Sequence, residues 1–270
     1  MTINRVWACY FSPTGNSRKI GLKIAGEVST ILNSEFSNID FTRPENRSEI
    51  AHFSEDDLVI MVLPTYAGRI PNKILPWVQE GFKAEGAMAV AVATYGNRSV
   101  DSALGEIKQV MTENGFKVIA GAAIVSEHAF SSQLAGGRPD ADDMAALENF
   151  AKDIVSVIDR EEPVDLGERE EVAPYYVPKK VDGTPAKFLK AKPVTDATLC
   201  TKCGVCSKAC PMGSIDGEEP AVVEGICIKC QGCIHACPAG AKSFDDPDFL
   251  SHRQMLIENF TRRAENQFYI

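Results

Sequence analysis

Eight of the nine cysteines in this 270-residue chain fall in two short runs, Cys200–Pro211 and Cys227–Pro238. Each run reads C-x2-C-x2-C-x3-C-P. Three cysteines at this spacing can turn their sulfurs toward one centre, whereas a fourth from the same loop would strain it. Zinc ribbons instead use well-separated C-x2-C pairs, and disulfides need an oxidising compartment. The spacing therefore favours a polynuclear metal cluster over zinc or disulfides.

The two runs resemble those of bacterial ferredoxins, which hold [4Fe–4S] clusters. In two-cluster ferredoxins, the fourth cysteine of each run binds the cluster of the other run. The resemblance implies single-electron transfer at low potential and a segment that needs iron to fold. It implies one cluster on Cys200, Cys203, Cys206 and Cys237, and a second on Cys210, Cys227, Cys230 and Cys233.

The chain is acidic, with a formal net charge of −9 and a pI of about 5.1. This balance argues against nucleic acid and anionic membranes as partners. No apolar run of the sequence approaches the ~20 residues of a membrane span. Residues 1–11 lead straight into a strand-like run without a signal peptide. We therefore expect a cytoplasmic protein in a reducing compartment.

Residues 1–160 alternate apolar runs with helical patterns. This alternation predicts a doubly wound α/β domain with a five-stranded parallel sheet covered on both faces. The expected strands are 6–11, 35–41, 58–63, 87–93 and 117–125, and the expected helices are 20–32, 71–82, 99–114 and 140–159. Beyond this domain we expect a Pro-rich linker over 161–195, a small α+β cluster domain over 196–246 and a C-terminal helix over 247–270.

Three loops follow strands of the predicted sheet at their carboxyl ends, where open α/β sheets bind ligands. The first, 12–17, places hydroxyls and a glycine before a helix, which is typical of an anion site. It lacks the G-K-[ST] ending of a P-loop and the G-x-G-x-x-G of dinucleotide folds. With no lysine supplied, it suits one terminal monophosphate. The other two loops, 64–69 and 94–98, each carry a tyrosine beside flexible glycine backbone.

Residues 1–160 resemble a short flavodoxin, and the whole chain resembles fusions of a flavodoxin-like domain with a two-cluster ferredoxin. The resemblance implies strand order 2-1-3-4-5 and FMN at the switch point between the first and third strands. Carried over to this sequence, loop one holds the phosphate and the other two loops flank the isoalloxazine. The implied FMN residues are Ser12, Thr14, Gly15, Asn16, Ser17, Pro64, Thr65, Tyr66, Ala67, Gly68, Thr94, Tyr95, Gly96 and Asn97.

The long loop 126–139 contains His128, a candidate proton donor to reduced flavin or substrate, although a solvated surface histidine is the plainer interpretation. We expect an electron-transfer protein that relays electrons between two [4Fe–4S] clusters and FMN, joining one-electron and two-electron steps. The alternative is an FMN-dependent reductase of a small acceptor such as a quinone, nitro compound or oxygen. The expected partner is an external redox protein or a small-molecule electron donor or acceptor, and a homodimer is left open.

Overall fold

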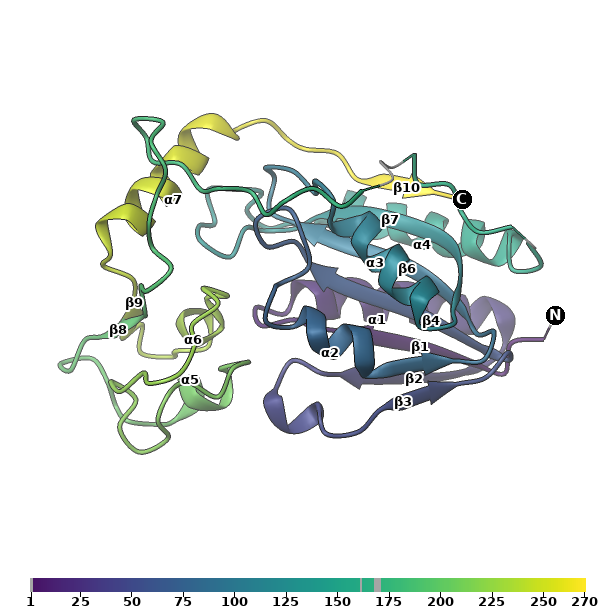
Figure 1. Ribbon diagram of the computed structural model, residues 1–270, viewed down its shortest axis with the longest axis horizontal. Coiled ribbons are helices and arrows are strands. Elements are labelled where there is room, and N and C mark those ends of the chain that lie inside the picture. The colour runs from purple at the N-terminus through teal and green to yellow at the C-terminus, as the bar shows by residue number, and fades with distance from the viewer. Residues whose placement is uncertain (1, 161, 168–170) are drawn as a thin grey trace.

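The computed structural model describes residues 2–160, 162–167 and 171–270. Its main sheet has the strand order β10-β7-β6-β4-β1-β2 (Figure 1). Strands β2, β1, β4, β6 and β7 pair in parallel, in the order expected of a flavodoxin-like sheet. Their bounds are β1 Arg5–Tyr10, β2 Glu35–Asp40, β4 Asp57–Pro64, β6 Met88–Tyr95 and β7 Lys117–Val125.

Helices cover both faces of this sheet, because each face presents a separate apolar core. On one face, α1 (Asn16–Leu32) and α4 (Ala141–Ser156) bury Ile24 and Phe150. On the other face, α2 (Leu75–Glu80) and α3 (Ala103–Glu113) bury Val78 and Ile107. Asp140 and Asp143 form a capping box at the start of α4, which fixes where this helix begins.

Some short elements escape the sequence patterns. The strands β3 (Ala51–Phe53) and β5 (Phe82–Ala84) form a separate parallel pair, and the 3-10 helix η1 covers Pro44–Asn46. The second helix begins four residues later than predicted, at Leu75, since the segment from Pro71 first makes a turn. Three-residue strands are too short to show a period of their own.

The C-terminal prediction of a helix over 247–270 is wrong in its extent. Helix α7 covers Pro247–Asn259, and β10 (Gln267–Tyr269) then pairs antiparallel with β7. The main sheet therefore has a sixth strand, supplied from far along the chain. Figure 1 shows this segment in yellow, running back from α7 to the edge of the sheet.

The cysteine-rich segment lies beside the carboxyl ends of the parallel strands (Figure 1). It contains the antiparallel pair β8 (Val194–Thr195) and β9 (Lys242–Ser243), with the short helices α5 (Val205–Lys208) and α6 (Gly232–His235). Gly232 lies so close to Pro13 that a Cβ atom there would be 3.0 Å from its carbonyl oxygen. The His235 Nε2 atom is 3.0 Å from the Ala129 carbonyl oxygen and donates to it. The segment therefore docks directly on the loops of the sheet.

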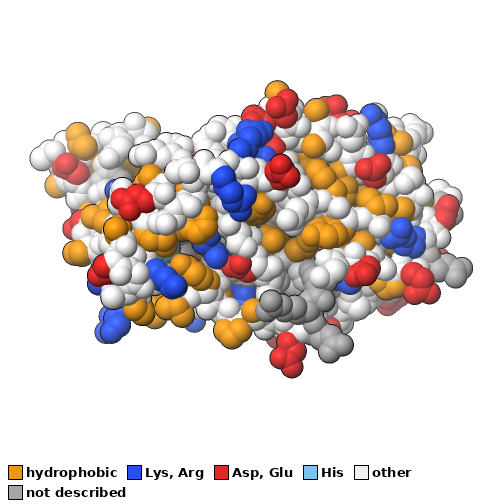
Figure 2. All heavy atoms as spheres, turned by 90° about the horizontal axis from the view of Figure 1, so that it is seen from above, with side chains coloured by type: hydrophobic (Ala, Val, Ile, Leu, Met, Phe, Trp, Pro, Cys, Tyr) orange, Lys and Arg blue, Asp and Glu red, His pale blue; other side chains and the backbone are white. Residues whose placement is uncertain are grey.

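Over residues 171–195 the linker runs along the surface as a fixed strap rather than as a free tether. Its Tyr176 amide donates to the Ala67 carbonyl oxygen at 2.8 Å, and the Tyr175 hydroxyl donates to the Ile70 carbonyl oxygen at 2.8 Å. Figure 2 shows acidic and basic side chains interspersed over the face seen from above, so this face carries no field of a single sign. Among the described helices, none is both long and apolar enough to cross a membrane.

Candidate functional site

A cavity of about 530 Å³ lies at the carboxyl edge of the sheet, where the three predicted loops meet the linker and the cysteine-rich segment. Of the residues predicted to hold FMN, Gly15 and Asn97 do not line it. The others do: Ser12, Thr14, Asn16, Ser17, Pro64, Thr65, Tyr66, Ala67, Gly68, Thr94, Tyr95 and Gly96. The fold thus brings together three loops that lie far apart in the sequence, at 12–17, 64–69 and 94–98.

Loop one ends at Gly15, which precedes the first turn of α1 with a φ of 94°. The Ser12 hydroxyl accepts the Arg18 amide at 2.9 Å, so it caps the helix from within the loop. Within the described part of the chain, the amides of Asn16 and Ser17 donate to no protein group. Free amides at a helix N-terminus favour an anion, and they fit the monophosphate that the sequence predicts here.

Loop two is held by a buried carboxylate that the sequence analysis missed. Glu106 of α3 is almost fully buried, accepts the Ile70 amide at 2.8 Å and pairs with the Arg69 guanidinium. Arg69 in turn lies 4.4 Å from the ring centroid of Tyr175. The hydroxyl of Thr65 is buried in the cavity wall and has no hydrogen-bond partner in the described structure. Such an orphaned polar atom fits a site whose ligand supplies the partner.

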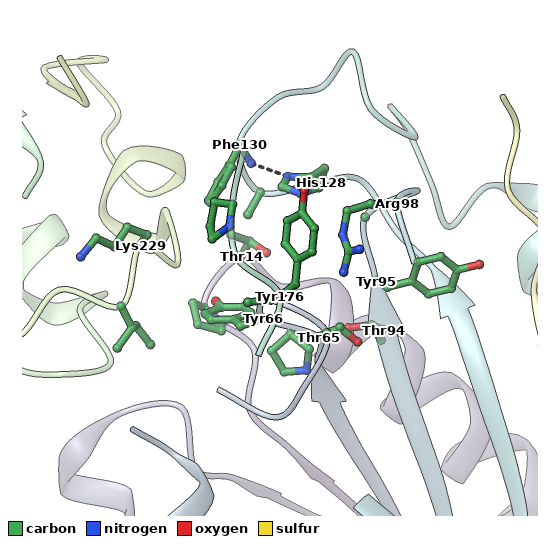
Figure 3. Close-up of a pocket in the computed structure, with 18 of the residues that line it drawn as sticks. Thr14, Thr65, Tyr66, Thr94, Tyr95, Arg98, His128, Phe130, Tyr176 and Lys229 are labelled. Carbon is green, nitrogen blue, oxygen red and sulfur yellow. Dashed lines mark hydrogen bonds between the residues drawn. The ribbon is translucent and has the colours of Figure 1, made fainter. Parts of the chain in front are cut away.

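Loop three differs from its prediction in two side chains. The Tyr95 ring points away from the cavity in Figure 3, and its hydroxyl donates to the Glu265 carbonyl oxygen at 2.9 Å. The Asn97 amide nitrogen donates to the carbonyl oxygens of Phe260 and Arg262 at 2.6 and 2.7 Å. Both side chains therefore secure the segment after α7. Sequence spacing placed them at the right loop but could not show which way they turn.

The linker supplies a wall of the cavity that no sequence motif predicted. Tyr176 stands between His128 and Tyr66 in Figure 3, and its ring centroid lies 4.2 Å from the Arg98 guanidinium carbon. Arg98 also pairs with Asp101, which offsets its charge at the cavity wall. Lys229 lines the cavity from the cysteine-rich segment, but its ammonium points away from the labelled residues in Figure 3 and donates to the Leu189 and Cys227 carbonyl oxygens.

His128 lies in the cavity wall, in contact with the backbone of Gly96. Its Nδ1 atom accepts the Phe130 amide at 3.0 Å, the dashed bond of Figure 3. Burial, then the nearby His252 and Arg98, lowers the pKa of His128 to about 4. Near neutral pH the ring is therefore uncharged, with its proton on Nε2. It can donate a hydrogen bond there, but it is no cationic acid.

This lowered pKa predicts a loss of stability in mild acid. The unfolded chain binds the His128 proton near pH 6.5 and the folded chain only near pH 4, so stability is complete above pH 6.5 and falls as pH drops toward 4. At pH 5 the loss is about 2 kcal/mol. Between pH 7.5 and 5.0, we expect the Tm of the wild-type protein to fall by about 4 to 8 °C more than the Tm of His128→Gln. An exposed-site control, His52→Gln, should match wild type, and equal losses in all three proteins would refute the assignment.

The cysteines lie in the two sets that the exchange of fourth ligands requires. Set I comprises Cys200, Cys203, Cys206 and Cys237, which line one small hollow. Set II comprises Cys210, Cys227, Cys230 and Cys233; burial first, and then the neighbouring thiols of the set, raise the pKa of Cys230. The two fourth cysteines have matching environments, since the Ser214 amide donates to Cys210 Sγ at 3.4 Å and the Ala241 amide donates to Cys237 Sγ at 3.3 Å.

Over residues 2–160, 162–167 and 171–270, no three His, Cys, Asp or Glu side chains converge closely enough to bind a single metal ion. A [4Fe–4S] cluster does not require such convergence, because its thiolates bind different irons.

Set II adjoins the cavity directly. Cys227 is one of the lining residues, between Ile226 and Ile228. Burial, followed by the adjacent Cys230 and Cys227, raises the pKa of Tyr66 well above its ordinary value. Set I lies farther out, and its Cys203 is exposed to solvent. The sites therefore follow one another from set I, which has one exposed cysteine, through the more buried set II, to the cavity.

Comparison with known proteins matches residues 192–238 to the 4Fe–4S dicluster domain. The chain joins a flavodoxin-like fold to this domain. No curated protein matches the chain. Its N-terminal part is similar to solved flavodoxins, each with a TM-score below 0.5: one from the domain Archaea (15% identity, TM-score 0.38, 58% of this chain and 99% of that one) and flavodoxin 2 from Bacillus cereus (14%, TM-score 0.41, 56% and 98%). A flavodoxin of Streptococcus pneumonia TIGR4 is similar at 17% identity and a TM-score of 0.40, over 56% of this chain and 98% of that one.

Proposed function

We propose that this is an electron-transfer flavo-iron–sulfur protein with one FMN and two [4Fe–4S] clusters. The observation that carries the proposal is that Cys227 of set II lines the same cavity as the three loops. The free amides of Asn16 and Ser17 would bind the FMN phosphate, and Thr65 would hydrogen-bond the flavin. When bound, FMN supplies one- and two-electron chemistry beside clusters that carry single electrons.

The residues around the cavity support this function, because they cover the cavity and hold the cysteine-rich segment against it. Tyr66 of loop two lies next to Cys227 and Cys230 of set II, and Tyr176 covers the cavity from the linker. Both ends of the cysteine-rich segment are fixed to the sheet domain, one through Tyr176 and the other through Asn97. Fixed geometry keeps donor and acceptor at high effective concentration within one chain. An external one-electron partner would meet the protein at set I, where Cys203 is exposed.

The decisive experiment is an anaerobic reductive titration followed by visible absorption and EPR, with released flavin and iron quantified. We expect about four electrons per chain, one for each cluster and two for FMN. Flavin reduction should proceed at a rate independent of protein concentration, because the donor lies in the same chain. Clusters without flavin, even after FMN is added, would overturn the proposal for the N-terminal domain.

A second candidate, an FMN-dependent reductase of a small acceptor, has one observation in its favour. The cavity continues beyond the three loops to His128, Phe130 and α7. A pure relay protein needs no such space. Turnover of a quinone or nitro compound faster than free FMN under the same conditions would support this reading.

A further inference from the structure

The side of the cavity that faces the three loops from the linker, loop 126–130 and α7 has a distinct composition. We call it the outer compartment. It is lined by loop 126–130, the linker and α7, through Phe130, Tyr176, Phe188, Leu189, His252 and Leu256. None of these side chains carries a formal charge when the histidine is neutral, and the neighbouring cation, Arg98, is paired with Asp101 and lies against the Tyr176 ring. An apolar, aromatic surface of this kind suits an uncharged ring system.

Two histidines give the compartment directional polar groups. His252 Nδ1 lies 2.8 Å from the Lys179 carbonyl oxygen, which can only accept, so Nδ1 carries the proton and Nε2 is left as an acceptor. His128 has the opposite tautomer, because its Nδ1 accepts the Phe130 amide and its Nε2 must donate. In the described structure neither Nε2 atom has a protein partner.

The rings that hold these histidines are fixed by aromatic contacts. Phe130 lies between them, with ring centroids 4.8 Å from His128 and 6.4 Å from His252. Phe188 stacks on His252 at 5.5 Å. Gly96 is needed for His128 to take this position, because a Cβ atom there would overlap the imidazole ring. The donor and the acceptor are therefore preorganised.

We propose that the outer compartment binds a small, uncharged aromatic compound whose carbonyl or nitro oxygen accepts a hydrogen bond from His128 Nε2. The inference rests on the proposed function only in placing this ligand beside the flavin site. Its class follows from the neutral aromatic walls and the single fixed donor. A neutral imidazole can polarise a carbonyl oxygen without giving up its proton.

The test uses the full-length protein loaded with FMN and clusters, and a pair of probes that differ in the carbonyl group, acetophenone and ethylbenzene. Binding is measured by isothermal titration calorimetry and by perturbation of the flavin spectrum. Acetophenone should bind about three- to tenfold more tightly than ethylbenzene, the range for one neutral hydrogen bond. His128→Ala should remove this preference while leaving ethylbenzene binding within about twofold of wild type.

Two further variants keep the test decisive. His128→Gln retains a side-chain N–H donor and should keep part of the preference, and His52→Ala, at an exposed site on β3, should keep all of it. Absence of saturable acetophenone binding, or an undiminished preference in a folded His128→Ala protein, would overturn the inference. If the protein binds no FMN, the proposed function fails separately, and calorimetry still decides the outer compartment.

Discussion

Substitution of Gly15 by valine should weaken FMN binding by roughly a hundredfold, which corresponds to about 2.7 kcal/mol. Gly15 has a φ of 94°, and a Cβ atom there would contact nothing within 4 Å. The loss of affinity therefore comes from the backbone alone. A residue with a Cβ atom is less stable by about 1–2 kcal/mol in the left-handed region, so valine would move the backbone out of this conformation. That movement would displace the amides of Asn16 and Ser17. Quenching of flavin fluorescence on titration with apoprotein measures the affinity.

The chain offers a matched control in Gly86. Its φ is 84°, its added Cβ atom would also meet nothing within 4 Å, and it is exposed between β5 and β6. Gly86→Val should lower the free energy of unfolding about as much as Gly15→Val but leave FMN affinity unchanged. If the two variants bound FMN equally well, loop one would not hold the phosphate.

Alanine at Cys210 or Cys237 should remove the cluster of the opposite run. Cys237 shares a hollow with Cys200, Cys203 and Cys206, although it lies in the second run. We therefore expect Cys237→Ala to lose the cluster of set I and Cys210→Ala to lose the cluster of set II. Iron content and EPR of the reduced protein would show which cluster remains.

Cys210→Ala and Cys237→Ala also distinguish the roles of the two clusters in electron transfer to FMN. Without the cluster next to the cavity, reduction of FMN by a one-electron protein donor should slow by about 10²- to 10⁴-fold, because the donor is no longer held in place. In Cys237→Ala, a small reductant should still reduce FMN through set II. Loss of the cluster belonging to the run that contains the substitution, in both variants, would contradict the exchange of fourth ligands.

The sequence predicted the elements whose signals are local. The strands β4, β6 and β7 are buried on both faces and read as continuous apolar runs, and the capping box of α4 lies within four consecutive residues. β10 gave no such signal, since its three residues become a strand only by pairing with β7. The predicted C-terminal helix was too long because Phe260 continues the apolar stripe of α7. In the structure, the carbonyl oxygen of Phe260 accepts a hydrogen bond from Asn97, and the helix has ended at Asn259.

In the candidate site, too, the sequence predicted only the features that have a local signal. Loop sequences identified the backbone around the cavity, but Glu106 and Tyr176 act through contacts made across the fold. A buried acid on a helix face, or a tyrosine in a Pro-rich linker, has no spacing that marks its role. The cysteine run 227–238 lies next to Tyr66 only in the folded structure, because the two are far apart in the sequence.

The pairing of β10 with β7 also sets an order of events during synthesis of the protein. When β7 emerges from the ribosome, the part of its edge at residues 121–123 has no partner until about 140 more residues have been made, an interval of roughly 7 to 30 s at typical translation rates. An unpaired apolar edge strand invites association with other chains. During this interval the two cysteine runs also emerge, and binding of the proposed clusters would order the segment that carries β10 to β7. Shortage of iron should therefore appear as aggregation of nascent chains, before it appears as loss of redox activity.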